Sequence, residues 1–202
     1  MMSFSEIEIV SKRASKSIGY SWGISEEIGK SVRLLEMFNL PGISTLNQYL
    51  KKIKSNHPKK LKNIDKTNKS DDEICPIYTG VSILDNCNQI QEFKVIKFFN
   101  MNYPLLIIPF LSRSSEIVNK QICLNLNDGK YILNSNKTIL TNIEKSNDFE
   151  NVNELTIEFL ENKNLFTDIE WKELYKMSED TFVPETENLK NSAAGAGLTD
   201  ND

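Results

Sequence analysis

A charged pattern near the N-terminus could bind an anion. Glu26, Lys30 and Arg33 follow one another at spacings of four and three residues, which places them on one face of a helix. Trp22 precedes this face by one turn, and Gly29 lies within it, although glycine costs a helix about 1 kcal/mol relative to alanine. The pattern indicates either a face that binds a carboxylate or phosphate, or a solvated face with a Glu–Lys pair. The glycine indicates close approach of a ligand or of another helix.

A second candidate site lies at the C-terminus. Residues 192–202 begin with small side chains and end with a hydroxyl and two carboxylates, from Thr199, Asp200 and Asp202. We interpret this run either as a disordered tail or as a flexible arm that folds over a site. In the second case the carboxylates could hold a hard cation such as magnesium, or bind an ammonium group. Thr181, in a Thr-Phe-Val-Pro run, could add a hydroxyl donor from an extended loop.

Histidine and cysteine are scarce, which restricts the possible chemistry. His57 is the only histidine and lies in a Lys-rich polar stretch, poorly placed for a Ser-His-Asp or Cys-His nucleophile. A metal site with two histidines from one chain is excluded. Cys75, Cys87 and Cys123 are an odd number without a Cys-x-x-Cys motif, so we expect neither a disulfide framework nor structural zinc. Acid–base chemistry would then fall to carboxylates, lysine, tyrosine or cysteine.

The composition narrows the class of protein. The chain has 202 residues, of which 39% are hydrophobic and 26% charged, values typical of globular proteins. Its net charge of −4 argues against a nucleic-acid partner. Its most apolar run, residues 104–111, is shorter than the roughly 20 residues that span a bilayer, and the first ten residues lack a signal-peptide pattern. We expect a cytoplasmic protein with no nucleic-acid or membrane partner, whose oligomeric state stays open.

Helical patterns occupy both ends of the chain. Ser3 with Glu6 forms a capping-box pattern before apolar residues at helical spacing, and Thr167 with Glu170 repeats it near the C-terminus. Ser25, followed by two glutamates, is the expected N-cap of the second helix. The expected helices lie at residues 4–18, 25–38, 45–54 and 168–178.

The middle of the chain is rich in β-branched and aromatic residues, which favour strands. Asn127-Asp128-Gly129 separates two such runs and predicts a hairpin. The expected strands lie at residues 93–99, 105–111, 121–126, 131–133, 138–143 and 155–159. Because helices and strands do not alternate here, we predict a mostly antiparallel sheet of at least four strands. The predicted fold is α+β, with N-terminal helices, this sheet, a C-terminal helix and a C-terminal arm.

We predict a single domain over residues 1–202. Its parts are a helical segment (1–53), a polar linker or loop with few hydrophobic residues (54–73), the sheet with its helix (74–178), and the arm (179–202).

Motifs at both ends resemble a known family. They are Lys12–Arg33, with its Ser-Trp-Gly, Glu-Glu and Gly-Lys steps, Thr181-Phe182-Val183-Pro184, and the Gly-Ala-Gly-Leu-Thr-Asp-Asn-Asp ending within 193–202. Cys75-Pro76-Ile77 with Gly80 adds to the likeness. The chain resembles a proteobacterial family of unknown function whose members have the length of this chain. The resemblance implies no activity, but it favours an ordered arm and a functional role for the Trp22–Arg33 segment.

Two classes of function remain open from the sequence. In the first, the protein binds a small polar or anionic metabolite, with possible catalysis by carboxylates and Lys30. In the second, it is a non-catalytic accessory subunit or protein-interaction module. The opposed cationic helix and anionic tail favour the first class, and the lack of a known catalytic motif favours the second.

Overall fold

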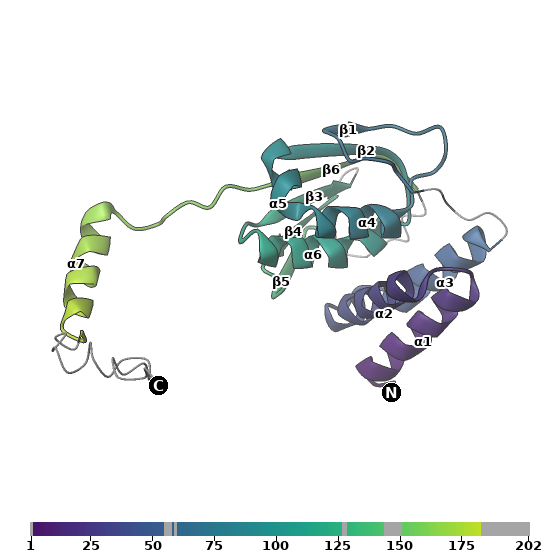
Figure 1. Ribbon diagram of the computed structural model, residues 1–202, viewed down its shortest axis with the longest axis horizontal. Coiled ribbons are helices and arrows are strands. Elements are labelled where there is room, and N and C mark those ends of the chain that lie inside the picture. Colours follow the sequence, from purple (N-terminus) through teal and green to yellow (C-terminus); the bar gives the residue numbers. More distant parts are fainter. Residues whose placement is uncertain (1, 55–57, 59, 127–128, 144–150, 183–202) are drawn as a thin grey trace, which may run out of the picture. The chain divides into compact units, whose positions relative to one another are not determined.

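The chain folds into two units, Met1–Asn162 and Lys163–Asp202. The computed structural model describes residues 2–54, 58, 60–126, 129–143 and 151–182 (Figure 1). Within these residues no helix is both long and apolar enough to cross a membrane.

Three helices open the first unit: α1 (Phe4–Ser17), α2 (Trp22–Met37) and α3 (Gly42–Ile53). Their presence confirms the N-terminal helical part. The N-cap predicted for α2 is wrong, because Ser21 accepts the hydrogen bond from the Ile24 N–H and the helix begins one turn earlier than expected. Ser25 is instead buried within α2. Both serines suit an N-cap, and tertiary packing decides between them.

The first unit contains one six-stranded sheet, in the order β1-β2-β6-β3-β4-β5. Its strands are β1 (Thr67–Asn68), β2 (Val95–Asn102), β3 (Ile122–Leu126), β4 (Gly129–Asn134), β5 (Thr138–Thr141) and β6 (Asn151–Phe159). All pairings are antiparallel except β1 with β2, which confirms the mostly antiparallel α+β prediction. In the sheet centre Leu124 of β3 lies opposite Tyr131 of β4 and Ile157 of β6, and all three are buried.

Helices cover one face of this sheet, where α4 and α6 lie side by side (Figure 1). The helices are α4 (Pro76–Asp85), α5 (Cys87–Ile90), the 3₁₀ turns η1 (Gln91–Phe93) and η2 (Pro104–Ile107), and α6 (Ile108–Ile117). The sequence patterns predicted neither α4 nor α5.

The predicted strand at 105–111 is wrong, because this segment forms η2 and the start of α6. All residues of this apolar run are buried, so polar and apolar side chains do not alternate along it. Periodicity therefore cannot distinguish a buried helix from a buried strand in this segment. Pro104 and Pro109 each occupy the first turn of a helix, where proline is well tolerated because that turn needs no N–H donor.

The polar segment 54–73 contributes to the sheet through β1. The Asn68 side chain is buried and hydrogen-bonds both to the preceding loop and to β2. Its Nδ2 donates to the backbone oxygens of Asp65 (2.6 Å) and Lys97 (3.1 Å). Its Oδ1 accepts from the Asp65 N–H at 2.9 Å. These bonds fix the end of the 60–65 loop against β2, and so position one wall of a pocket described below.

The second unit contains α7 (Asp168–Glu179), which confirms the predicted C-terminal helix. Thr167 and Glu170 form the predicted capping box, since each side chain accepts a hydrogen bond from the other residue's backbone N–H. None of the residues in α7 is buried.

Candidate functional site

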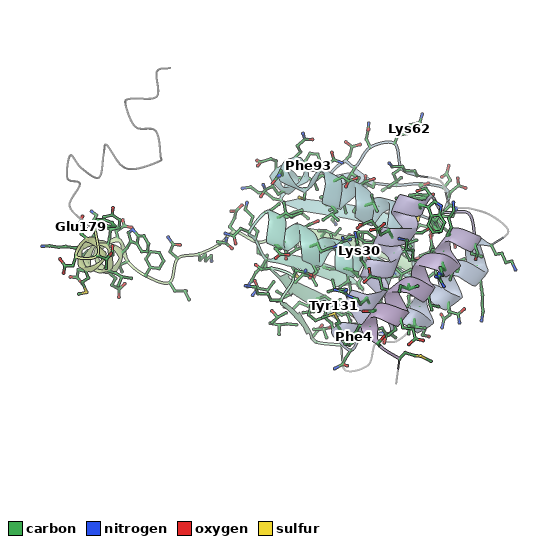
Figure 2. All side chains as sticks on the ribbon, turned by 60° about the horizontal axis from the view of Figure 1, so that its bottom comes forward. Phe4, Lys30, Lys62, Phe93, Tyr131 and Glu179 are labelled. Carbon is green, nitrogen blue, oxygen red and sulfur yellow. The ribbon has the colours of Figure 1, made fainter. Side chains whose placement is uncertain are left out.

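The predicted charged face of α2 is occupied by ion pairs. The Lys30 ammonium lies 3.0 Å from Glu27 Oε1 and 3.5 Å from Glu26 Oε1, and Arg33 Nη1 lies 2.9 Å from Glu8 Oε2 of α1. Lys30 lies where the N-terminal helices border those that cover the sheet (Figure 2). Both predicted anion-binding cations thus already face carboxylates, an arrangement typical of a solvated, ion-paired helix surface.

The other residues of this face serve helix packing. A Cβ added to Gly29 would lie 2.6 Å from the Glu8 carbonyl oxygen, so the glycine admits the backbone of α1. Trp22 is 59% exposed, and the ammonium groups of Lys12 and Lys16 lie 6.0 and 5.3 Å from its ring centroid. Of the two partners that the sequence left open for the glycine, the structure provides the neighbouring helix.

Glu27 links this face to the helices over the sheet. Its carboxylate accepts a hydrogen bond from Arg113 of α6 at 2.6 Å. Partial burial raises the pKa of Glu27, but the hydrogen bonds from Arg113 and Lys30 outweigh it and hold the pKa below its usual value. Glu27 therefore stays ionised at neutral pH as a structural anion.

The remaining predicted site residues belong to the second unit, Lys163–Asp202. Thr181 lies in the second unit, where its hydroxyl donates to the Ser178 carbonyl at 2.7 Å and closes the end of α7. Thr199, Asp200 and Asp202, with the magnesium site predicted on them, lie outside the described residues, as does His57. In the described part of the chain, no group of three histidine, cysteine or acidic side chains is placed to hold a metal.

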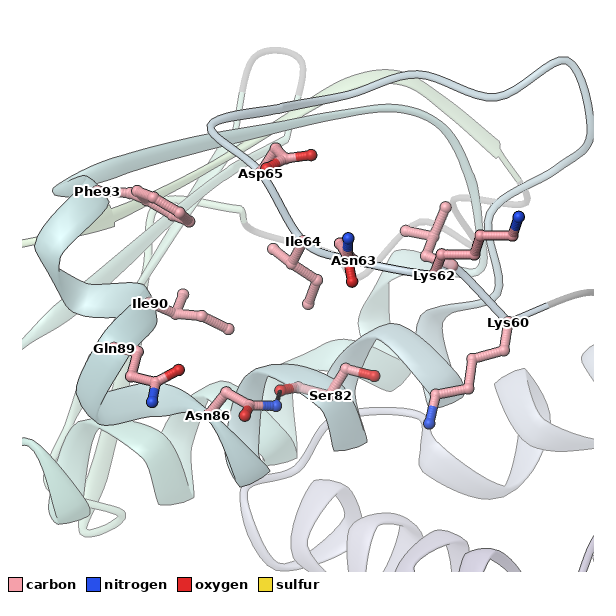
Figure 3. Close-up of a pocket in the computed structure, with 11 residues that line it drawn as sticks. Lys60, Lys62, Asn63, Ile64, Asp65, Ser82, Asn86, Gln89, Ile90 and Phe93 are labelled. Carbon is pink, nitrogen blue, oxygen red and sulfur yellow. Dashed lines mark hydrogen bonds between the residues drawn. The ribbon is translucent and has the colours of Figure 1, made fainter.

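A pocket of about 450 Å³, which the sequence patterns did not predict, lies between the 60–65 loop and the helical segment 82–93 (Figure 3). We call it the loop–helix pocket. Its lining combines cationic, amide and apolar side chains. They are Lys60, Leu61, Lys62, Asn63, Ile64, Asp65, Ser82, Asn86, Gln89, Ile90 and Phe93.

Polar and apolar groups occupy different ends of the loop–helix pocket. Lys60 extends from the loop toward α4, whereas Ile64, Ile90 and Phe93 turn toward one another at the other end (Figure 3). Lys62 extends outward at the rim (Figure 3). Neither lysine has an ion-pair partner among the residues described, in contrast to Lys30. The pocket can therefore receive an anionic group beside an apolar one.

A second pocket, of about 460 Å³, lies between α3, the chain before α4, and the end of β2. Lys52 Nζ lies 2.7 Å from Glu73 Oε1 and donates to Asn102 Oδ1 at 3.3 Å, and Asn102 Nδ2 donates to the other Glu73 oxygen. Burial raises the pKa of Glu73, but the hydrogen bonds from Lys52 and Asn102 dominate and lower it. These three polar side chains hydrogen-bond to one another, so the pocket has less need of hydrogen-bond partners from a ligand.

The floor of the second pocket contains a buried thiol. The Tyr49 hydroxyl bonds Cys75 Sγ at 2.9 Å and the Tyr20 hydroxyl at 3.1 Å, while Sγ accepts from the Tyr78 N–H at 3.4 Å as the N-cap of α4. Burial raises the pKa of the thiol more than these hydrogen bonds lower it. A buried thiol of raised pKa is a poor nucleophile, so the cluster is a packing element that joins the turn before α2, helix α3 and the start of α4.

Comparison with known proteins shows similarity to one family but indicates no activity. No curated protein and no solved structure matches the chain. Residues 2–75 match the model of a family described as "Protein of unknown function (DUF3726)". This segment includes α1 to α3 and ends at Cys75, so it contains both the ion-paired face and the three side chains of the thiol cluster. Over residues 2–75 the chain is thus similar to a family of unknown function, as expected from the sequence, while the predicted motifs at residues 181–184 and 193–202 lie outside the matched segment.

Proposed function

We propose that the protein binds a small anionic molecule with an apolar moiety in the loop–helix pocket. The observation that carries the proposal is the pair Lys60 and Lys62, which line a cavity without a carboxylate partner in the described chain. The cations of the α2 face, by contrast, are already neutralised. Unpaired cations beside a cavity attract an anion and are free to form charge-assisted hydrogen bonds with it.

The rest of the lining supports the same class of ligand. Asn63, Asn86, Gln89 and Ser82 provide neutral donors and acceptors that could orient a carboxylate or phosphate. Among the described residues of the lining, Asp65 is the only acidic one, and Lys60 and Lys62 give the lining a positive formal charge. The apolar end can take a flat or aliphatic group against Phe93.

The pocket is held by the fold rather than by the loop alone. Asn68 fixes the loop end beside β2, and Ile90 is buried in the core below the opposite wall. A wall that is already ordered loses less conformational entropy when a ligand binds, which supports binding of a small molecule.

Titration with model ligands tests the proposal. Phenyl phosphate supplies both an anion and an apolar ring, inorganic phosphate lacks the ring, and benzyl alcohol lacks the charge. We expect phenyl phosphate to bind most tightly, measured by calorimetry or by amide chemical-shift changes. We expect Lys60→Ala to weaken it about tenfold, the effect of losing one charge-assisted hydrogen bond.

Lys66→Ala is the matched control, since Lys66 follows the same loop but does not line the pocket. Phe93→Ala should weaken phenyl phosphate but leave inorganic phosphate unchanged. Equal losses for Lys60→Ala and Lys66→Ala, or shifts that map to α2 rather than to residues 82–93, would contradict the proposal.

A further inference from the structure

Neutral polar side chains separate the cationic end of the loop–helix pocket from its apolar end (Figure 3). They are Asn63, Ser82 and Asn86, which we call the middle zone. Gln89 belongs with Ile90 and Phe93 to the part of the helical wall farther from the lysines (Figure 3). A ligand that fills the pocket therefore meets three kinds of lining in a fixed order: cationic, neutral polar and apolar.

The middle zone can both donate and accept hydrogen bonds. Asn86 Nδ2 donates to the Ser82 carbonyl oxygen at 2.9 Å, which holds this side chain against α4 and leaves its Oδ1 as an acceptor. Neither the Ser82 hydroxyl nor the Asn63 amide has a hydrogen-bond partner among the described residues. Sugar hydroxyls donate and accept in the same way, so a sugar matches this zone, whereas an alkyl or phenyl group would leave it without partners.

The two ends of the pocket define the groups that flank this sugar. Lys60 extends over the pocket, whereas Lys62 extends outward at the rim, so the cationic end suits one phosphate group rather than two (Figure 3). At the other end the half-buried ring of Phe93 offers a surface on which a flat base can stack. The Gln89 amide in the same part of the lining can donate and accept together, the pattern that pairs with the edge of adenine.

We infer that the loop–helix pocket binds a free nucleoside monophosphate, with its phosphate at Lys60, its ribose in the middle zone and its base against Phe93. The inference rests on the proposed function and narrows its ligand to one class. A sugar phosphate lacks a group for the apolar end, and an aromatic phosphate lacks one for the middle zone. The chain's net charge of −4 favours a free nucleotide over a nucleic-acid chain, whose many phosphates require a basic surface.

Calorimetry on the full chain with three probes tests the inference. The probes are adenosine 5′-monophosphate, ribose 5-phosphate, which lacks the base, and phenyl phosphate, which lacks the sugar. We expect adenosine 5′-monophosphate to bind about tenfold more tightly than ribose 5-phosphate, the effect of stacking one base. We expect it to bind at least about fivefold more tightly than phenyl phosphate, the effect of the added hydrogen bonds.

Two variants separate the zones. Asn86→Ala should weaken both ribose-containing probes about fivefold and change phenyl phosphate less than about twofold. Gln89→Ala should weaken adenosine 5′-monophosphate and leave ribose 5-phosphate unchanged. Asn88→Ala is the matched control, since Asn88 lies on the same helical wall but does not line the pocket, and it should leave all three affinities unchanged.

The outcomes distinguish this inference from the proposed function. Phenyl phosphate that binds as tightly as adenosine 5′-monophosphate, and is weakened by Lys60→Ala, would overturn the nucleotide and leave the proposed function standing. No binding of any of the three probes would contradict both. Equal effects of Asn86→Ala and Asn88→Ala on adenosine 5′-monophosphate, or tighter binding of a single-stranded oligoadenylate than of the free nucleotide, would also overturn the inference.

Discussion

Gly29→Ala tests the close contact between α1 and α2. The new methyl group would lie 2.6 Å from the Glu8 carbonyl oxygen and 3.2 Å from the Lys12 Cβ. Because the nearest atom is backbone, relief requires a shift of α1 rather than a change of rotamer. Overpacking of this kind costs about 1–3 kcal/mol. Alanine offsets about 1 kcal/mol of this through its higher helix propensity, so the net loss of unfolding free energy should be about 0–2 kcal/mol.

Gly23→Ala provides the matched control on the same helix, since no atom lies within 4 Å of its added Cβ. We expect it to leave stability unchanged or raise it by up to about 1 kcal/mol. Urea denaturation followed by circular dichroism measures both variants, and Gly29→Ala should melt up to about 8 °C lower than the parent and always lower than Gly23→Ala. If Gly29→Ala is as stable as Gly23→Ala, the glycine is not required for the helix contact, and the case for ligand approach at this position returns.

Three further predictions follow from other contacts. Tyr49→Phe removes the hydroxyl from the buried Cys75 cluster and should cost about 1–3 kcal/mol in urea denaturation, since the partners lose a bond that water cannot replace. Glu27 has a lowered pKa in the folded state, so its contribution to stability is complete above its unfolded pKa and is lost as the pH falls through the folded one. Stability of the parent should therefore fall more steeply than that of Glu27→Gln from about pH 5 downward, and parallel curves would contradict this. Deletion of residues 199–202 should lower the melting temperature if the arm is ordered; unchanged melting with amides that exchange at unfolded rates would show a disordered tail.

The sequence predicted those elements whose signals are local. The capping box at Thr167, the apolar spacing of the N-terminal helices and the Asn127-Asp128-Gly129 hairpin each depend on a few neighbouring residues, and each element formed. The segment 105–111 failed because a buried apolar run satisfies a strand and a helix equally. The polar continuation at residues 112–115 favours a helix, because the apolar run together with this continuation is longer than a short strand.

The candidate site was less predictable than the fold, because a sequence shows where cations gather but not which of them the fold neutralises. Lys30 and Arg33 share a helix face with Glu26, yet their structural partners include Glu8, which lies 25 residues from Arg33. Lys60, in a segment that resembled a linker, faces a cavity whose other wall comes from residues 82–93. The usable signal was the pair Leu61 and Ile64, apolar residues that a solvated linker does not need and that pack against the core here. The proposed anion site therefore rests on an apolar anchor beside lysines that have no carboxylate partner in the described chain, because the anchor implies a fixed wall, whereas a row of charges on a helix implies only an accessible face.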